Sequence, residues 1–348
     1  MTTTGDVRVS GIQPLDSPAD LLAALPLTGR RASLVARARD AVHDVLTGRD
    51  DRLVVVVGPC SIHDPVAALD YARRLAREAE RHSESLLVVM RVYFEKPRTT
   101  VGWTGLINDP GLDGGHDVSR GMRTARQLLC DILDTGLPVG CEFLDPITPQ
   151  FIADAVSWGA IGARTTESQV HRHMASGLSM PVGFKNGTDG GLQATFDACR
   201  TAANGHTFFG VDQTGRASVV STTGNPDCHV VLRGGQDGPN YGPQQVDAAL
   251  TGLGRAGLPR RLMIDASHAN SGKDHERQPG VARGIADQVR AGQNGIVGVM
   301  LESFIAPGRQ DLLPGAALTY GQSVTDACMG WETTAVVLDE LAAARDRS

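Results

Sequence analysis

The sequence has no hydrophobic run long enough to cross a membrane. Its longest aliphatic stretches are Leu53–Val57 and Leu86–Met90, far shorter than the roughly 20 residues of a membrane-spanning helix. The N-terminal region carries Asp6, Arg8 and Asp16 without an apolar segment between them, so it does not resemble a signal peptide. We therefore expect a soluble cytoplasmic protein with no membrane partner.

The sequence also lacks closely spaced pairs of cysteines and a net positive charge. The six cysteines form no CxxC pair, which argues against a zinc knuckle or a thioredoxin motif. The net charge of −6 argues against a nucleic-acid partner, because a surface that binds nucleic acid is basic. With 41% hydrophobic and only 21% charged residues among 348, the chain has enough apolar material for a packed core.

Lysine is the scarcest charged residue. Of the 33 lysines and arginines, only Lys96, Lys185 and Lys273 are lysine. Lysine and arginine differ in shape, hydration and pKa range. In so arginine-rich a chain, each lysine is therefore a candidate for a position that arginine cannot serve.

From Leu53 onward, short β-branched segments alternate with longer amphipathic ones, without a linker or an internal repeat. Strands are predicted at Leu53–Val57, Leu86–Val92, Val139–Phe143, Ala160–Ala163, Pro181–Phe184, Thr207–Val211, His229–Arg233, Leu262–Asp265 and Ile296–Leu301. Helices are predicted at Ser33–Leu46, Pro65–His82, Val118–Thr135, Pro149–Ser157, Ser168–Gly177, Leu192–Ala203, Gln244–Ala256, Val281–Ala291 and Thr333–Ala344.

Thr207–Val211 differs from the other strands because no helix follows it. Gly215 and a second alternating segment, Ala217–Ser221, come next, which predicts an antiparallel hairpin at about residues 206–222. The remaining eight strand–helix units favour an α/β fold, a (β/α)8 TIM barrel over residues 51–348, with residues 1–50 as an N-terminal extension. A doubly wound open sheet is less favoured, because it would be expected to show a glycine-rich turn after the first strand.

In such a barrel the active site lies at the C-terminal ends of the strands. The side chains there are polar or reactive: Cys60, Arg91, Glu142, Arg164, Lys185, Arg233, His268 and Glu302. Four of them are cationic, and Lys96 and Arg98 in the loop after the second strand add two more. Solvated surface charges are the alternative, but converging cations need anions to neutralise them, so we expect a small phosphorylated metabolite as ligand.

Cys60, His268, Glu302 and Asp326 form a second set of candidate residues. Together they offer sulfur, nitrogen and oxygen donors, a mixture that suits zinc, manganese, iron or cobalt better than magnesium or calcium. A catalytic pair, with Cys60 as nucleophile and His268 as its base, is the alternative. That alternative leaves the converging cations unexplained.

Five segments of the chain closely resemble one family of enzymes. They are Gly58–His63, Arg91–Trp103, Gly159–Ser168, Pro181–Thr188 and Asp326–Glu332. On these motifs the chain resembles the type I 3-deoxy-D-arabino-heptulosonate 7-phosphate (DAHP) synthases. Within that family it is most similar to the feedback-regulated branch, which carries an N-terminal extension and an inserted hairpin. The resemblance extends from about residue 6 to residue 332, so residues 1–50 would be a regulatory and oligomerisation extension.

The resemblance implies a metal-dependent, aldol-like condensation of phosphoenolpyruvate with D-erythrose 4-phosphate, the first step of the shikimate pathway. It also implies one divalent metal per subunit (Mn2+, Fe2+, Co2+ or Zn2+), a homodimer or homotetramer, and an aromatic amino acid as feedback inhibitor. By position, the implied metal ligands are Cys60, His268, Glu302 and Asp326. The implied substrate-binding residues are Arg91, Lys96, Arg164, Lys185 and Arg233 for phosphoenolpyruvate, with Arg98 and Thr99 for the aldose phosphate. Lys96 or Lys185 is the expected general acid.

The resemblance also maps an effector cavity onto the chain. Its residues would be Asp6 from a neighbouring subunit, with Pro146, Gln150, Leu178, Ser179, Phe208, Gly210 and Val220. Pro146 and Gly210 resemble the tyrosine-sensitive forms, so tyrosine is the expected inhibitor, with an unregulated enzyme as the alternative. A sibling synthase would use arabinose 5-phosphate instead, and an effector-binding partner subunit would be catalytically inactive. The intact motifs argue against both of these assignments.

Overall fold

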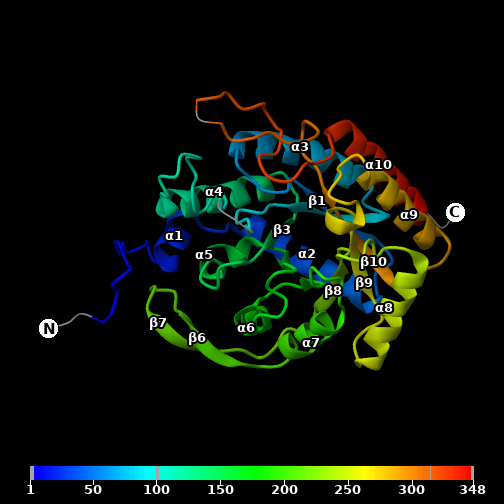
Figure 1. Ribbon diagram of the computed structural model, residues 1–348, viewed down its shortest axis with the longest axis horizontal. Helices are drawn as coiled ribbons and strands as arrows, with labels where there is room; N and C mark the ends of the chain where they lie inside the picture. Colours follow the sequence, from blue (N-terminus) through cyan, green and yellow to red (C-terminus); the bar gives the residue numbers. More distant parts are fainter. Residues whose placement is uncertain (1–3, 99–101, 314, 346–348) are drawn as a thin grey trace.

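The computed structural model describes residues 4–98, 102–313 and 315–345. Within these ranges, eight parallel strands close into a barrel in the order β1-β10-β9-β8-β5-β4-β3-β2, which confirms the predicted fold class (Figure 1). The strands are β1 (Leu53–Gly58), β2 (Leu86–Arg91), β3 (Val139–Glu142), β4 (Trp158–Ile161), β5 (Val182–Lys185), β8 (Cys228–Leu232), β9 (Leu262–Asp265) and β10 (Ile296–Glu302).

Helices surround the barrel (Figure 1). They are α3 (Pro65–Arg81), α4 (Val118–Asp134), α5 (Pro149–Ile152), α6 (Gln169–Gly177), α7 (Gln193–Ala202), α8 (Pro243–Arg255), α9 (Gln278–Arg290) and α10 (Trp331–Arg345). Helix α3 shows why such segments are helical. The side chain of Asp64 caps its N-terminus, and Ala68, Tyr71 and Leu75 recur at helical spacing to bury one face. None of the helices in the described ranges combines the length and the apolarity needed to cross a membrane.

Two further helices precede the barrel, α1 (Pro18–Ala24) and α2 (Gly29–Thr47), and α2 begins four residues before its predicted start. The buried side chains of Val42 and Val45 on α2 pack in one cluster with Trp158 and other residues of the barrel interior. Helix α2 therefore closes the end of the barrel at which the strands begin.

The predicted hairpin is present as β6 (Thr207–Val211) and β7 (Ala217–Ser221), which pair antiparallel outside the barrel (Figure 1). Its turn is anchored at two places. The carbonyl oxygen of Gln213 accepts a hydrogen bond of 2.8 Å from the backbone of Ala19 in α1, and its side chain donates to Gln150 in α5 at 3.5 Å. The hairpin thus joins the N-terminal segment to the barrel wall.

The helix predicted at Pro149–Ser157 is wrong over its second half. Helix α5 ends at Ile152, and a 3₁₀ turn covers Ala153–Ala155. The Arg39 guanidinium donates to the carbonyl oxygens of Ala153 and Val156 at 2.8 to 3.0 Å. The Ala153 carbonyl also accepts from the N–H of Val156 at 3.2 Å, and the N–H of Ser157 donates to Val139 in β3 at 2.8 Å, so the α-helix does not continue to Ser157.

The strand predicted at Ala160–Ala163 is misplaced by two residues, since β4 covers Trp158–Ile161. Trp158 is fully buried, and its indole nitrogen donates to His229 Nε2 at 3.2 Å across the barrel interior. Residues 162–165 form the turn that follows, so Arg164 lies in the loop above the strand.

Candidate active site

A cavity of about 260 Å³ opens at the C-terminal ends of the barrel strands, where a barrel of this kind builds its active site. We call it the main cavity. It is lined by the candidate residues Arg91, Lys96, Arg98, Arg164, Lys185, Arg233, His268 and Asp326, and by Glu142 at the end of β3. Thr99, the other candidate for the aldose phosphate, lies outside the described residues.

The main cavity is strongly cationic. Arg91, Lys185 and Arg233 are buried, with exposed fractions of 1%, 3% and 8%. Arg91 and Lys185 each lie against a buried carboxylate, whereas burial lowers the pKa of Arg233. Burying a cation costs free energy that a bound anion can offset. The cavity therefore fits a small molecule with more than one anionic group.

Lys273 is a residue of this cavity to which the sequence analysis gave no role. Its φ angle is +61°, and its backbone N–H donates to the carbonyl oxygen of His268 at 2.6 Å. It lines the main cavity beside His268 and Asp326. All three lysines of the chain thus lie in one cavity, and the scarcity of lysine was the signal that could have found the third.

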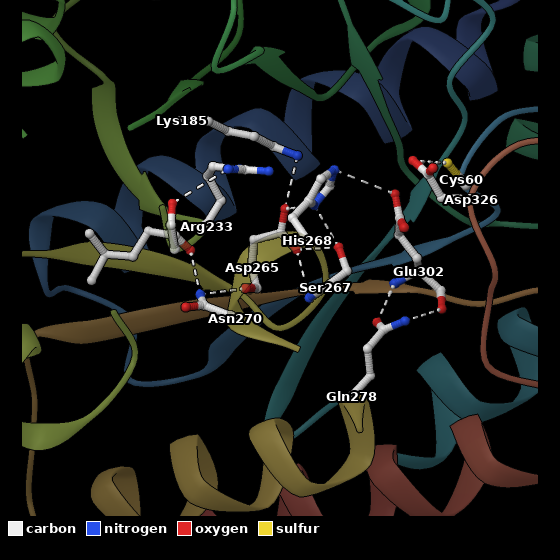
Figure 2. A network of polar contacts seen from close by, with 12 residues as sticks. Cys60, Lys185, Arg233, Asp265, Ser267, His268, Asn270, Gln278, Glu302 and Asp326 are labelled. Atoms are coloured by element: carbon white, nitrogen blue, oxygen red, sulfur yellow. Dashed lines mark hydrogen bonds and ion pairs between the residues drawn. The ribbon is translucent and has the colours of Figure 1, made fainter. Parts of the chain in front are cut away.

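The candidate metal ligands converge next to this cavity. The ligand atoms of Cys60, Glu302 and Asp326 all lie within 4.8 Å of one another. Cys60 Sγ is 3.5 Å from Asp326 Oδ2, and His268 Nε2 is 3.9 Å from Glu302 Oε1 (Figure 2). The four side chains come from the ends of three strands and a later loop, and they offer one sulfur, one nitrogen and two carboxylates.

Lys96 bridges two of these ligands. Its Nζ donates to Cys60 Sγ and to Asp326 Oδ2, both at 2.8 Å. Burial alone would lower the pKa of the Lys96 ammonium. The negative charges of Cys60, Glu302 and Asp326 outweigh this effect, so the pKa is raised. Burial also raises the pKa of the Cys60 thiol, to about 11. The cluster therefore favours a positive charge between the thiol and the carboxylate.

Glu302 is held rigidly by its backbone. Its N–H donates to Gln278 Oε1 at 3.0 Å, and Gln278 Nε2 donates back to its carbonyl oxygen at 3.2 Å (Figure 2). The side-chain Oε1 lies 3.1 Å from an Arg91 nitrogen, yet it accepts no hydrogen bond from the part of the chain that the structure describes. A buried carboxylate oxygen that has an ion-pair partner but accepts no hydrogen bond from the described residues, beside a thiol and a second carboxylate, fits a divalent cation.

Asp265 orients His268. The carboxylate is fully buried, and its Oδ2 lies 2.9 Å from His268 Nδ1, while Ser267 Oγ is 2.7 Å from the same nitrogen. Because Nδ1 faces these partners, Nε2 is the nitrogen left to face Glu302 and a metal. His268 has a φ angle of +55°, a conformation that only a surrounding network sustains. Asp265 and Gln278 had no predicted role: Gln278 reaches Glu302 from helix α9, 24 residues earlier in the chain, and Asp265 acts through the close turn that brings it to His268.

A second cavity, of about 520 Å³, lies between the hairpin, α5 and α6. It is lined by six of the eight residues expected to bind an effector, namely Pro146, Gln150, Leu178, Ser179, Phe208 and Val220. Gly210 and Asp6 are not among its lining residues. A Cβ atom at Gly210 would lie 2.8 Å from Cγ2 of Val220, so the residue at 210 affects this cavity through Val220.

Glu95 is a buried acid whose carboxylate accepts hydrogen bonds from the backbone of Leu144 and the hydroxyl of Thr148. Burial and the charge of Asp145 raise its pKa from 4.5 to about 8. A raised carboxyl pKa means that the folded protein holds a proton that the unfolded chain releases, so stability is full below pH 4.5 and is lost as the pH rises through 8. We expect Glu95→Gln to match the wild type near pH 5 and to exceed its free energy of unfolding by roughly 2–4 kcal/mol at pH 9.

Urea unfolding of both proteins at pH 5, 7 and 9 measures this difference. Asp145→Asn serves as a matched variant, because removal of the neighbouring negative charge lowers the pKa of Glu95. The loss of stability in that variant should therefore be smaller and complete at a lower pH. A stability difference between Glu95→Gln and wild type that does not change with pH would contradict the assignment.

Comparisons with known proteins place the chain in one family of enzymes. A family model described as the DAHP synthetase I family matches residues 30–339. The phospho-2-dehydro-3-deoxyheptonate aldolase of Corynebacterium glutamicum is 56% identical over 349 residues, which cover 98% of this chain and 94% of that protein.

Relatives with named effectors are similar over the same length. The Phe-sensitive phospho-2-dehydro-3-deoxyheptonate aldolase of Escherichia coli is 54% identical, over 97% of this chain and 96% of that one. The Tyr-sensitive phospho-2-dehydro-3-deoxyheptonate aldolase of Salmonella typhimurium is 52% identical, over 97% of this chain and 94% of that one. Among solved structures, the phospho-2-dehydro-3-deoxyheptonate aldolase of Francisella tularensis superposes with a TM-score of 0.95 at 46% identity, over 97% of this chain and 98% of that one.

Proposed function

Because the chain belongs to the DAHP synthetase I family, we propose that it condenses phosphoenolpyruvate with D-erythrose 4-phosphate to give DAHP and phosphate. Its enzyme class is 3-deoxy-7-phosphoheptulonate synthase, and its place is in the biosynthesis of aromatic amino acids through the shikimate pathway. The observation that carries the proposal is the cationic main cavity directly beside a cluster of sulfur, nitrogen and oxygen ligands.

The cations of the main cavity match the charges of the two substrates. Phosphoenolpyruvate carries a phosphate and a carboxylate, and Arg91, Arg164, Lys185 and Arg233 would hold them by charge-assisted hydrogen bonds. Arg98 lines the same cavity and would hold the phosphate of the aldose. This binding would hold C3 of the enol phosphate next to the aldehyde carbon. The entropic cost of bringing the two reacting atoms together is then lower.

Cys60, His268, Glu302 and Asp326 would hold one divalent metal, of which Mn2+, Fe2+, Co2+ and Zn2+ suit the donor set. A bound metal would act as a Lewis acid on the aldehyde oxygen. C3 of the enol phosphate bonds to the aldehyde carbon, and the aldehyde oxygen takes up a proton from a lysine. The attack leaves positive charge at C2, which water captures by losing one proton to the deprotonated lysine. The hydroxyl group formed at C2 then becomes the ketone, giving its proton to the phosphate as the bond between C2 and the phosphate oxygen breaks. Lys96, which already contacts two of the ligands, is the nearest candidate for the proton donor.

Release of phosphate from phosphoenolpyruvate tests the proposal. We expect release that requires erythrose 4-phosphate, stops on chelation and returns when Mn2+ is restored. Arabinose 5-phosphate serves as the second aldose, and release with it alone would assign a sibling synthase. Absence of release with either aldose would indicate an inactive, effector-binding subunit and would refute the proposal.

We further propose that an aromatic amino acid binds the second cavity and inhibits the enzyme, with tyrosine as the preferred effector. The support is the cavity itself, together with relatives named Tyr-sensitive and Phe-sensitive. A homodimer or homotetramer, in which Asp6 of a neighbouring subunit reaches this cavity, and a cytoplasmic location remain predictions. Size-exclusion chromatography and cell fractionation test them.

The residue at position 210 tests the tyrosine preference. A side chain there would displace Val220, whose Cγ2 lies 2.8 Å from the site of an added Cβ atom. We expect Gly210→Ser to weaken inhibition by tyrosine by ~10-fold, a loss of about 1.4 kcal/mol of binding free energy, while uninhibited turnover is unchanged. Titration of tyrosine, phenylalanine and tryptophan in the phosphate-release assay measures this. Stronger inhibition of the wild type by phenylalanine than by tyrosine would contradict the preference.

A further inference from the structure

One carboxylate oxygen contacts both halves of the active site. Asp265 Oδ2 accepts a hydrogen bond of 2.9 Å from Lys185 Nζ and lies 2.9 Å from His268 Nδ1 (Figure 2). Lys185 belongs to the cations of the main cavity, and His268 belongs to the metal-ligand cluster.

The carboxylate is fixed in place by bonds on its other side. Oδ1 accepts from the backbone N–H of Ser267 at 2.9 Å and from its hydroxyl at 2.6 Å. The side chain of Asn270 donates to the backbone carbonyl of Asp265 at 2.8 Å. With an exposed fraction of 0%, Asp265 has no water to replace these partners. The carboxylate therefore cannot rotate when an anion binds Lys185. His268 instead experiences the change in the charge on Oδ2.

We propose that Asp265 is a positioning residue that couples anion binding at Lys185 to metal binding at His268. The proposal rests on the proposed function, because that function supplies the anion as a substrate phosphate and the metal as cofactor. An anion that binds Lys185 shares the ammonium with Asp265 and leaves Oδ2 more negative. The hydrogen bond from His268 Nδ1 then strengthens and makes Nε2 a better metal ligand. By linkage, the metal tightens anion binding by the same factor.

Manganese affinity measured on the full-length protein tests this coupling without any turnover. Electron paramagnetic resonance reports free Mn2+ in titrations with and without saturating inorganic phosphate, and a protein-free blank corrects for manganese phosphate in solution. We expect phosphate to lower the Mn2+ dissociation constant of the wild type by ~5-fold or more. In Asp265→Asn we expect the dissociation constant to rise by ~10- to 100-fold and the phosphate effect to disappear.

Two further variants keep the test decisive. Asp154→Asn removes a carboxylate that pairs with the buried Arg126 at 2.7 Å outside the cavity, so it should retain the full phosphate effect. Lys185→Met should lose that effect even if Asp265→Asn does not fold. A wild-type Mn2+ affinity that phosphate does not change would overturn the proposal, and so would an unchanged phosphate effect in folded Asp265→Asn or in Lys185→Met.

The outcome is separable from that of the proposed function. Coupled binding of Mn2+ and phosphate in a protein that releases no phosphate from phosphoenolpyruvate would refute the function and leave the coupling in place. Metal-dependent synthase activity in a protein that binds Mn2+ equally well with and without phosphate would support the function and refute the coupling.

Discussion

Lys96→Met is expected to bind Mn2+ at least as tightly as the wild type and yet to turn over ~10³-fold more slowly. The Lys96 ammonium donates to Cys60 and Asp326 at 2.8 Å each, so it competes with a metal for two of the ligand atoms. Methionine removes the competing charge and keeps an unbranched side chain that is one atom shorter. It also removes the proposed proton donor, whose contribution is typically ~10² to 10⁴ in rate.

Two variants make this result specific. Lys96→Arg keeps the charge but not a readily transferred proton, so its turnover should also fall, and an unchanged kcat would remove Lys96 as the general acid. Lys273→Met removes the same charge from the lining of the same cavity and should lose less activity. Free Mn2+ and phosphate release are measured on the wild type and on each variant. A Lys96→Met enzyme with weaker Mn2+ binding would show that the lysine supports the metal instead of competing with it.

Glu302→Gln is expected to lower the free energy of unfolding by ~3–5 kcal/mol in metal-free protein and to abolish stabilisation by Mn2+. Glu302 and Arg91 are 2% and 1% exposed, with Oε1 and Nη2 3.1 Å apart. Removing one partner of a buried pair leaves the other charge uncompensated. Arginine keeps its proton in proteins, so the Arg91 guanidinium cannot escape this cost by becoming neutral.

Urea unfolding with and without Mn2+ measures both effects. In the wild type, Mn2+ at about a hundred times its dissociation constant should add about 2.7 kcal/mol. The control is Glu340→Gln, which breaks an ion pair of 2.9 Å to Arg283 on the surface, where the side chains are 32% and 54% exposed. That change should cost at most ~1 kcal/mol. A Glu302→Gln protein as stable as the control, and still stabilised by Mn2+, would show that Glu302 is not a ligand.

The barrel could be predicted because its signals are local. β-Branched runs alternate with amphipathic segments, and Thr207–Val211 stands out since no helix follows it. The helix at Pro149–Ser157 was predicted too long for a non-local reason. Arg39, 117 residues away from Val156, binds the carbonyl oxygen of that residue, and the N–H of Ser157 donates to Val139 of β3 instead of to Ala153. No pattern within the segment itself contains that information.

The same distinction applies to the site. Strand ends and family motifs identified the cations and the candidate ligands, which the structure places around one cavity and one cluster. The roles of Asp265 and Gln278 arise only when β5, β9, β10 and α9 are assembled, since each side chain acts on a residue of another element. Lys96 was predicted as a substrate ligand from its motif, whereas its contacts with both Cys60 and Asp326 appear only in the structure.

The closure of the barrel by α2 decides where this chain can be cut or joined. Residues 4–16 are exposed in the single subunit and belong to neither of the buried apolar clusters, so they are not part of this closure. Removal of α2 would instead open the barrel interior, since Val42 and Val45 cover the same apolar cluster as Trp158. An exposed apolar opening of this kind invites aggregation. A catalytic fragment without the N-terminal extension would therefore need a substitute cover for the barrel, whatever the extension contributes to regulation.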